Sequence, residues 1–405
     1  MGRLSSLAFT SLAHFINDGS VFFVPFIAAI LAAQKGVSPL GISLMFFVFY
    51  ASSSALSLYV GRVADRSGRA FFMIGLGLAL LSTGMVVFYL SLTYTEGPSL
   101  ILLIMLAAFI AGFGSAFYHP LGASVLQSAY LKKSRGLALG INGSLGSVGR
   151  ALYPSLFFVI GAYLTGYSPI VFFAVVGFLA ATIVTAGSKS DGDEKLMGNR
   201  VPQREGRSIM TKGIVTLTLI AFLRSLATQG ISSWIPTYLS TQKGLGVSNT
   251  LGLTLTAMYA SAIVGQPVFG LLMDRFDKRA VLGLSSVGSA LSVLAYLSVS
   301  NPIVGLGVLF IFGFFTFSAF PLLLALTSDY VPRGPSSLAN ALVWGIGSTA
   351  GGVVGPPLVG AMTLNDYARL GFSFEAMAAL VLISAVATTL VPKASKPNGA
   401  TPLAA

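Results

Sequence analysis

The chain has 405 residues, of which 55% are hydrophobic and only 9% are charged, and its mean hydropathy is +0.85. This composition excludes an ordinary soluble globular protein and indicates a chain that crosses the lipid bilayer many times. The absence of cysteine excludes disulfides, thiolate metal sites and cysteine nucleophiles, and with only two histidines we expect neither a metal centre nor a cofactor. The formal charge of +12 is spread over short loops, so we interpret it as a topology signal and not as a nucleic-acid surface.

A spanning helix needs about 20 mostly apolar residues. This rule places six spans in the first half of the chain, near 7–32, 40–61, 70–92, 99–126, 136–163 and 168–187. It places six more in the second half, near 213–240, 248–271, 280–299, 302–328, 336–363 and 370–391. We therefore expect an all-α polytopic membrane protein with twelve transmembrane helices. Its expected parts are an N-terminal six-helix bundle (1–187), a cytoplasmic linker (188–212), a C-terminal six-helix bundle (213–392) and a disordered cytoplasmic tail (393–405).

The distribution of lysine and arginine predicts the orientation, because basic loops stay on the cytoplasmic side. With the N-terminus in the cytoplasm, 19 of the 24 basic residues fall in cytoplasmic segments, and three fall outside: Lys35, Lys243 and Arg369. The remaining two, Arg150 and Arg224, lie inside spans. We therefore expect both termini in the cytoplasm.

Charged residues gather in a hairpin between spans two and three, Gly61-Arg62-Val63-Ala64-Asp65-Arg66-Ser67-Gly68-Arg69. A second copy follows about 209 residues later, at Gly270-Leu271-Leu272-Met273-Asp274-Arg275-Phe276-Asp277-Lys278-Arg279. Other short stretches repeat at offsets of 208 to 211, among them Ala33–Gly36 with Thr241–Gly244 and Tyr50–Ser52 with Tyr259–Ser261. Such agreement over separate features predicts two structurally similar halves.

Glycine is concentrated in spans five and eleven, at Gly140, Gly143, Gly146, Gly149, Gly345, Gly347, Gly351, Gly352 and Gly355. Small residues at this spacing let helix backbones approach closely, so we interpret them as packing positions. The glycines of span five do not follow a strand, which excludes a dinucleotide site.

The twelve spans in two halves, the central loop and the duplicated hairpin resemble the major facilitator superfamily over nearly the whole chain. The resemblance implies that the hairpin is a cytoplasmic latch, in which Asp65 caps a helix amino terminus across the bundle interface and Arg66 and Arg69 are its ionic partners. A carboxylate gains at such a position from unpaired amides and the helix dipole. The expected latch residues are Gly61, Asp65, Arg66, Arg69, Asp274 and Arg275.

Two further stretches resemble the fosmidomycin-resistance type of efflux protein: Ala13-His14-Phe15-Ile16-Asn17-Asp18 and Gly112-Phe113-Gly114-Ser115-Ala116-Phe117-Tyr118-His119-Pro120. This resemblance implies a proton-coupled exporter in the inner membrane of a prokaryote. The chain departs from the pattern after Pro120, where Leu121-Gly122 replaces polar and charged residues, and in carrying Arg150 within the glycine run of span five.

A charge at bilayer depth costs about 2.5–3.5 kcal/mol or more, so each one should face a cavity or a partner. Asp18 is the one carboxylate expected near mid-membrane, and His14 lies one turn before it on the same helical face, with Asn17 adjacent. We expect Asp18 to carry the coupled proton; the alternative is a fixed ion pair that holds helices together. His119 either relays protons or packs as a neutral ring.

Arg150 and Arg224 are candidate partners of Asp18 or anion ligands, since guanidinium binds carboxylate or phosphonate bidentately. The superfamily's arrangement of spans one, four, seven and ten around a central cavity favours Arg224 as cavity-facing. For Arg150, ligand binding and pairing at the bundle interface remain equal alternatives. Further candidate substrate contacts are Asn17, Gln229, Trp234 and Asn340.

These residues predict a secondary active transporter that works as a monomer in the bilayer and moves a small organic solute in exchange for protons. Arg150 and Arg224 make an anionic solute one alternative. Export is favoured by the resemblance. The alternatives are proton-coupled uptake of an organic acid, and a non-transporting sensor or scaffold with the same fold. An enzyme is disfavoured, because the sequence has no pair of nucleophile and base and no nucleotide loop.

Overall fold

The computed structural model of the chain describes residues 2–67, 69–187, 210–330, 339 and 341–393. The first half contains seven helices: α1 (Arg3–Lys35), α2 (Pro39–Ser67), α3 (Ala70–Tyr94), α4 (Gly97–Ser115), α5 (Tyr118–Ala129), α6 (Lys132–Gly161) and α7 (Ser168–Gly187). The second half contains α9 (Lys212–Thr241), α10 (Asn249–Arg275), α11 (Lys278–Leu297), α12 (Pro302–Thr316), α13 (Ala319–Asp329), η2 (Ala341–Thr349), α15 (Ala350–Met362), η3 (Tyr367–Arg369), α16 (Leu370–Ala387) and η4 (Thr388–Leu390). The expected linker (188–209) and most of the tail (394–405) lie outside the described residues.

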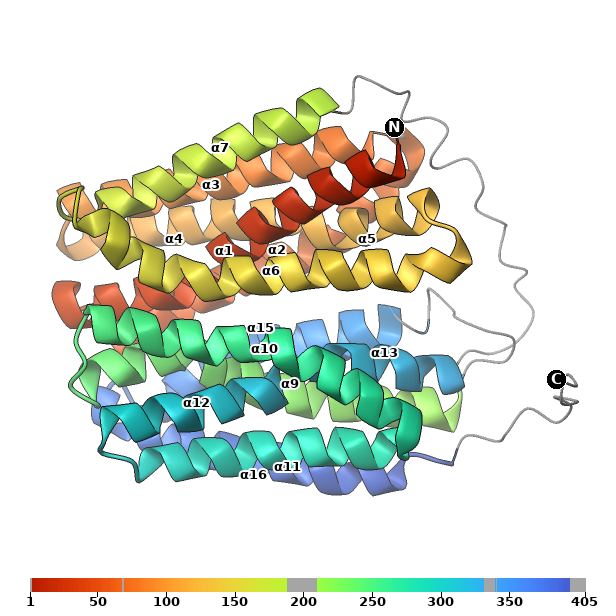
Figure 1. Ribbon diagram of the computed structural model, residues 1–405. Coiled ribbons are helices and arrows are strands. Elements are labelled where there is room, and N and C mark those ends of the chain that lie inside the picture. Colours follow the sequence, from red (N-terminus) through yellow and green to blue (C-terminus); the bar gives the residue numbers. More distant parts are fainter. Residues whose placement is uncertain (1, 68, 188–209, 331–338, 340, 394–405) are drawn as a thin grey trace, which may run out of the picture.

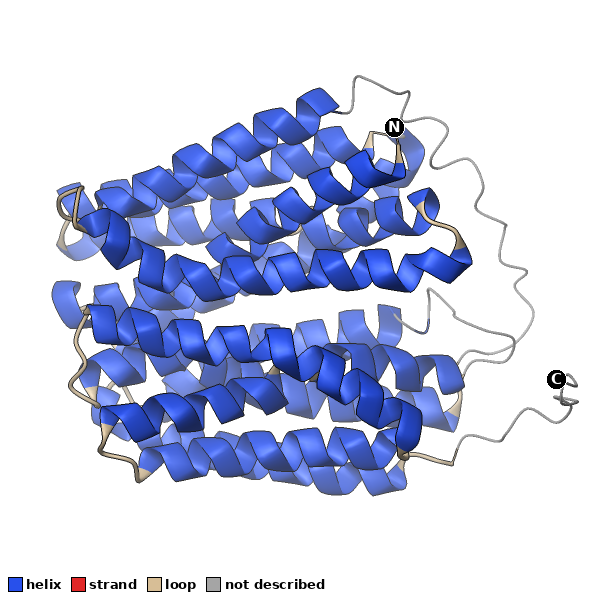
Figure 2. Ribbon diagram, viewed as in Figure 1, coloured by secondary structure: helices blue, strands red, loops and turns tan. Residues whose placement is uncertain are grey.

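Ten helical stretches of the described chain are long and apolar enough to cross a membrane. The 30-residue α6, and α12 followed by α13, complete the twelve expected spans. The helices form two bundles lying side by side, one from α1–α7 and one from α9–α16 (Figure 1), and the parts of the chain drawn as described are helices and connecting loops (Figure 2). Between the bundles α6 packs against α10, α2 against α15 and α1 against α9. The expected all-α fold of two six-helix bundles is confirmed.

Spans four and ten are each broken in two, which the sequence analysis did not predict. α4 ends at Ser115 and α5 begins at Tyr118, whereas α12 ends at Thr316 and α13 begins at Ala319. The two breaks are separated by 201 residues, and the helix that follows each break has proline as its third residue. Proline lacks an N–H and is tolerated in a first helical turn but not in a helix interior, so it favours a fresh start at this place.

The charged hairpins are shorter than expected because the helices before them continue. α2 runs to Ser67, so most of the first motif is helical, and α10 runs to Arg275 before the short connection to α11. The helix α2 therefore continues about two turns beyond the predicted end of span two near residue 61. Span eleven is also irregular: the described part begins as the π-helix η2 and becomes regular only in α15.

The two bundles are joined by hydrogen bonds at the end that carries loops 36–38 and 363–366. The Leu40 amide donates to Asn365 Oδ1 at 3.1 Å, and the Tyr367 hydroxyl donates to the Val37 carbonyl. Within this loop Leu364 and Asn365 both have left-handed backbones, with φ of 48° and 64°. Toward the opposite end, which carries the N-terminus, glycines of α6 and η2 face open space. The structure thus joins the bundles by hydrogen bonds at one end, whereas toward the other end Gly136, Gly140, Gly143 and Gly345 have no neighbour within 4 Å.

Candidate functional site

The centre of the candidate site is Asp18 on α1, whose side chain is only 1% exposed. His14 lies one turn earlier on the same helix, and its Nε2 is 3.4 Å from Asp18 Oδ2. The neighbouring Asn17 donates from Nδ2 to Asp18 Oδ1 at 3.1 Å. The helical spacing therefore places one carboxylate, one imidazole and one amide within a single polar patch, as expected for residues four apart.

The break in span four brings the second histidine to the same carboxylate. His119 is the second residue of α5, and its Nε2 lies 3.5 Å from Asp18 Oδ1. Its side chain is 61% exposed, whereas that of Asp18 is buried. The ring of His119 stands edge-on to that of His14, with centroids 5.6 Å apart. His119 thus connects a buried acid to accessible surface, and both histidines of the chain meet at one acid.

One face of α6 completes the cluster through residues spaced one turn apart. Asn142 Oδ1 lies 3.0 Å from His14 Nδ1, and Arg150 donates from Nη2 to Asp18 Oδ2 at 2.9 Å. Between them, Gly146 leaves room for the His14 ring, since a Cβ there would lie 2.4 Å from it. Gly149 similarly allows the backbone of α1 to approach at Phe15. The packing role expected for these two glycines of span five is confirmed, and it serves the site.

Arg150 also faces the C-terminal bundle. Its guanidinium lies 4.1 Å from the centre of the Phe22 ring and 5.5 Å from that of Phe317, which falls in the break between α12 and α13. Tyr259 of α10 packs edge-on against Phe22 at 5.4 Å. Arg150 Nε and the Tyr259 hydroxyl are buried without a hydrogen-bond partner among the described residues. Aromatic faces stabilise a guanidinium, so this cluster forms an amphipathic site between the two bundles.

The cluster balances one negative charge against one fixed positive charge and also contains two imidazole rings. Moving a bare carboxylate this deep would be costly, and the adjacent guanidinium offsets that cost. Ligand-type atoms of His14, Asp18 and His119 lie within 4.8 Å of one another, a spacing at which they can share a small cation. Because the Arg150 guanidinium already pairs with the Asp18 carboxylate, we interpret that small cation as a proton. The expected absence of a metal stays a prediction.

The structure places Arg224 away from this cluster. Its guanidinium is 5% exposed and donates to Ser286 Oγ at 3.2 Å, to Ser285 Oγ at 3.1 Å and to the carbonyls of Phe315 and Thr316 at 3.3 Å. The Phe315 and Thr316 carbonyls lie at the C-terminal end of α12, inside the membrane. The negative end of the helix dipole at this place favours a cation. Arg224 therefore does not have the cavity-facing position that we expected, and its acceptors in this conformation all come from its own bundle.

The remaining predicted substrate contacts lie in different surroundings. Gln229 donates from Nε2 to the Tyr50 hydroxyl at 2.8 Å, joining the two bundles, while the fully buried Trp234 donates to the Pro356 carbonyl at 2.8 Å. Trp234 is thus held by its own bundle in this conformation. Asn17 belongs to the Asp18 cluster, and Asn340 lies outside the described residues.

The predicted latch is only partly described. Nothing is described for the side chains of Gly61, Asp65 and Arg66, and Arg69 is exposed next to α3. In the second copy Asp274 and Arg275 are exposed at the end of α10.

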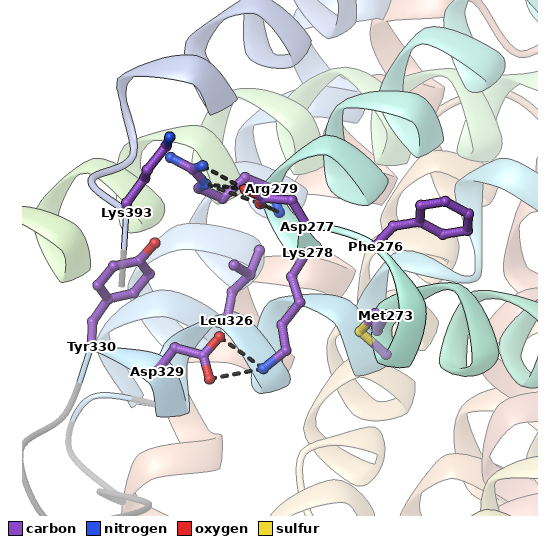
Figure 3. Close-up of a pocket in the computed structure, with 9 residues that line it drawn as sticks. All are labelled: Met273, Phe276, Asp277, Lys278, Arg279, Leu326, Asp329, Tyr330 and Lys393. Atoms are coloured by element: carbon purple, nitrogen blue, oxygen red, sulfur yellow. Dashed lines mark hydrogen bonds and ion pairs between the residues drawn. The ribbon is translucent and has the colours of Figure 1, made fainter. Parts of the chain in front are cut away.

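Different residues carry the charge pairs of the second hairpin (Figure 3). Asp277 caps α11 and accepts from Arg279 Nε at 3.0 Å, and Lys278 reaches Asp329 Oδ2 at 2.7 Å. An open pocket at this end of the C-terminal bundle is lined by both pairs and by Tyr330. The sequence analysis missed Asp329, because nothing in the chain shows that the end of α13 meets the start of α11.

Sequence reasoning also missed Asn142, Tyr118 and the aromatic residues around Arg150. The spacing of Asn142, Gly146 and Arg150 at four-residue intervals was a usable signal, because it puts two polar groups and a gap on one helix face. The aromatic contacts gave no such signal, since each joins Arg150 to a different helix or loop, Phe22 on α1 and Phe317 in the opposite half of the chain.

Comparison with known proteins decides the family. The model of the Major Facilitator Superfamily matches residues 10–251 and 242–404. The chain belongs to the major facilitator superfamily. It is therefore a multi-pass membrane transporter that acts on small molecules, and not an enzyme.

Relatives within the superfamily include efflux proteins. The chain is 26% identical over 384 residues to the fosmidomycin resistance protein of Escherichia coli (strain K12), covering 92% of this chain and 89% of the relative. It is 28% identical over 345 residues to the multi-drug resistance efflux pump PmrA of Streptococcus pneumoniae serotype 4, covering 79% and 81%. The expected resemblance to the fosmidomycin-resistance type is confirmed.

Solved structures of superfamily transporters share the fold. A bacterial homologue of the human lysosomal transporter Spinster, in an inward-facing and unoccupied conformation, superposes with a TM-score of 0.75 at 18% identity, covering 96% of each chain. A bacterial homologue of the iron transporter ferroportin, in an inward-facing state, gives a TM-score of 0.72 at 14% identity over 96% of this chain and 98% of the other.

Proposed function

We propose that this transporter couples proton movement to the export of a small organic solute from the cytoplasm. The observation that carries the proposal is the meeting of both histidines of the chain at the buried carboxylate of Asp18, next to Arg150 at the bundle interface. A carboxylate in contact with two imidazoles provides groups on which a proton can be carried. The names of the relatives support export.

The basic loops support an orientation with both termini in the cytoplasm of a cell whose inner membrane holds the protein. In that orientation the hydrogen bonds between the bundles lie at the outer end and the glycines with open surroundings lie toward the inner end, which supports an inward-facing state. Alternating access then requires the outer bonds to break while the inner ends close around the site. A monomer contains the whole Asp18 cluster, which supports a monomeric unit.

The charge of the solute decides which way protons can drive it. A carboxylate or phosphonate bound to Arg150 would release Asp18 from its partner, and the freed carboxylate would then take up a proton more readily. Anion and proton would therefore bind together and move in the same direction, which is uptake of an organic acid. A neutral or cationic solute that displaces Arg150 from the aromatic faces competes with the proton, as export by exchange requires.

Purified transporter in liposomes with an imposed pH gradient tests the proposal. Hydrophobic organic cations are the first probes for export, followed by fosmidomycin, which the relative from Escherichia coli is named for, and by simple organic acids as anionic probes. Solute accumulation that depends on the gradient and disappears in Asp18→Asn is the expected result. Glu375→Gln, which alters an exposed acid near the outer end of α16, is the matched control.

Solute movement that is indifferent to the pH gradient, or undiminished in Asp18→Asn, would overturn the coupling. Accumulation of an organic acid inside vesicles together with protons would establish uptake in place of export. Binding of every class of probe without any movement would assign the chain a sensing role.

A further inference from the structure

The two ring nitrogens of His14 face different partners. Nδ1 lies 3.0 Å from Asn142 Oδ1, and Nε2 lies 3.4 Å from Asp18 Oδ2. The same Asn142 oxygen accepts a hydrogen bond from the Tyr118 hydroxyl at 2.9 Å. With the Asn142 amide oriented as in the structure, an oxygen that only accepts faces His14, and this places the hydrogen of His14 on Nδ1.

This tautomer has a consequence at the other nitrogen. A neutral imidazole with its hydrogen on Nδ1 has a lone pair on Nε2, here directed at a carboxylate oxygen. Two acceptors at 3.4 Å repel each other unless a proton lies between them. In this arrangement the space between Nε2 and the carboxylate is suited to one shared proton.

We propose that Asn142 is a positioning residue for the coupled proton. It fixes the hydrogen of His14 on Nδ1, so that Nε2 and Asp18 form the proton-holding pair, and His119 joins that pair to solvent. The role in coupling rests on the proposed function, whereas the tautomer itself is measured without any transport.

The surroundings of His14 agree with this assignment. The titratable and charged groups that face it are Asp18 on its own helix, Tyr118 and His119 on α5 and Arg150 on α6. Asn142 is 5% exposed, so water does not compete effectively for its oxygen, and Gly146 one turn later leaves the space that the ring occupies. A buried acceptor on the outer nitrogen of a working imidazole is the usual means of setting its tautomer.

Nitrogen-15 NMR of histidine-labelled protein in nanodiscs reads the tautomer directly. The chain has only two histidines, so with a histidine-free purification tag the spectrum contains two rings, which His14→Gln and His119→Gln assign by removing one each. We expect His14 to keep its hydrogen on Nδ1 at every pH and to gain and lose the second proton at Nε2. In Asn142→Leu, which has no acceptor for Nδ1, the neutral ring should carry its hydrogen on Nε2 and donate to Asp18.

Two further variants keep the proposal falsifiable if Asn142→Leu folds poorly. Asn142→Asp retains an acceptor and should retain the Nδ1 hydrogen. Ser144→Ala, on the same helix with its hydroxyl bonded to the Gly140 carbonyl, should change nothing. A wild-type His14 that is neutral with its hydrogen on Nε2, or a tautomer unchanged in Asn142→Leu, would overturn the proposal. Loss of the tautomer together with unaltered proton-coupled transport would refute its role in coupling but leave the proposed function standing.

Discussion

Arg150 and Asp18 form a direct ion pair between α6 and α1, with Nη2 and Oδ2 2.9 Å apart and the side chains 13% and 1% exposed. The pair lies inside the N-terminal bundle, but the guanidinium also contacts Phe317 of the opposite bundle. The position of the Arg150 side chain therefore links the ionisation of Asp18 in the first bundle to a contact with the second bundle.

Removing the guanidinium should destabilise the protein more than removing both charges. Arg150→Leu leaves a buried carboxylate without its fixed cation and should cost about 3–5 kcal/mol. The double variant Arg150→Leu/Asp18→Asn should recover most of that loss, because no unpaired charge remains. Thermal unfolding in detergent measures both. Additive losses in the double variant would mean that the two residues do not act as a pair.

The glycines of α6 offer a matched comparison along one helix. A Cβ at Gly146 would overlap the His14 ring, so Gly146→Ala should cost about 1–3 kcal/mol through overpacking. Gly140 faces open space, and Gly140→Ala should be neutral or stabilise by up to about 1 kcal/mol. Unfolding temperatures of the two variants give the answer. Equal effects would show that α1 does not pack on α6 through this glycine.

Arg224 should matter for stability before it matters for transport. Arg224→Leu removes a donor from two serine hydroxyls and from the last carbonyls of α12, at about 1–3 kcal/mol for each buried group left unpaired. Arg275→Leu, at an exposed site, should change the unfolding temperature little. If Arg224→Leu instead unfolds normally and loses substrate binding, the original prediction of a substrate contact is restored.

Weakening the hydrogen bonds between loops 36–38 and 363–366 should shift the conformational equilibrium. Asn365→Ala and Tyr367→Phe each remove one bond between the bundles, worth about 0.5–1.5 kcal/mol, or about a 2- to 10-fold change in population. Because the chain has no cysteine, a single Gly140→Cys, at a position with no neighbour within 4 Å, reports accessibility without background. Its labelling should slow in both variants. Tyr163→Phe, at a side chain that is 86% exposed, should leave the rate unchanged.

The second hairpin should respond to acid. The hydrogen bond from Arg279 lowers the pKa of Asp277 to about 2, against an ordinary value near 4. A lowered pKa means that the ionised cap stabilises the fold fully above pH ~5, and that this contribution fades as the pH falls from ~4 toward 2. The difference in unfolding temperature between wild type and Asp277→Ala should therefore be constant at neutral pH and shrink below pH 4. A difference that grows in acid would contradict the assigned cap.

Hydropathy predicted the spans well because lipid leaves the backbone little choice but helices about 20 residues long. It did not predict the breaks at 116–117 and 317–318, since Pro120 and Pro321 read equally well as kinks within continuous spans. Hydropathy also placed the ends of α2 and α10 too early. Charged residues can extend a helix beyond the hydrocarbon, and the sequence marks only where the apolar run stops.

Some residues of the candidate site could likewise be predicted from the sequence, and others could not. His14 and Asp18 were predictable as neighbours because one helix carries both, four residues apart. The arrival of His119 and Arg150 at the same carboxylate depends on how α5 and α6 rotate against α1, which no single-helix pattern specifies. Arg224 shows the limit most clearly, because a polar side chain on span seven can face either the interface or its own bundle.

Backbone strain in loop 363–366 offsets part of the stabilisation that its hydrogen bonds to the other bundle provide. Leu364 and Asn365 hold left-handed backbones at φ of 48° and 64°, at about 1–2 kcal/mol for the leucine and less for the asparagine. That is comparable to one bond between Asn365 and Leu40. The strained loop therefore reduces the net stability of the closed end, which leaves the two conformations of a carrier closer in free energy.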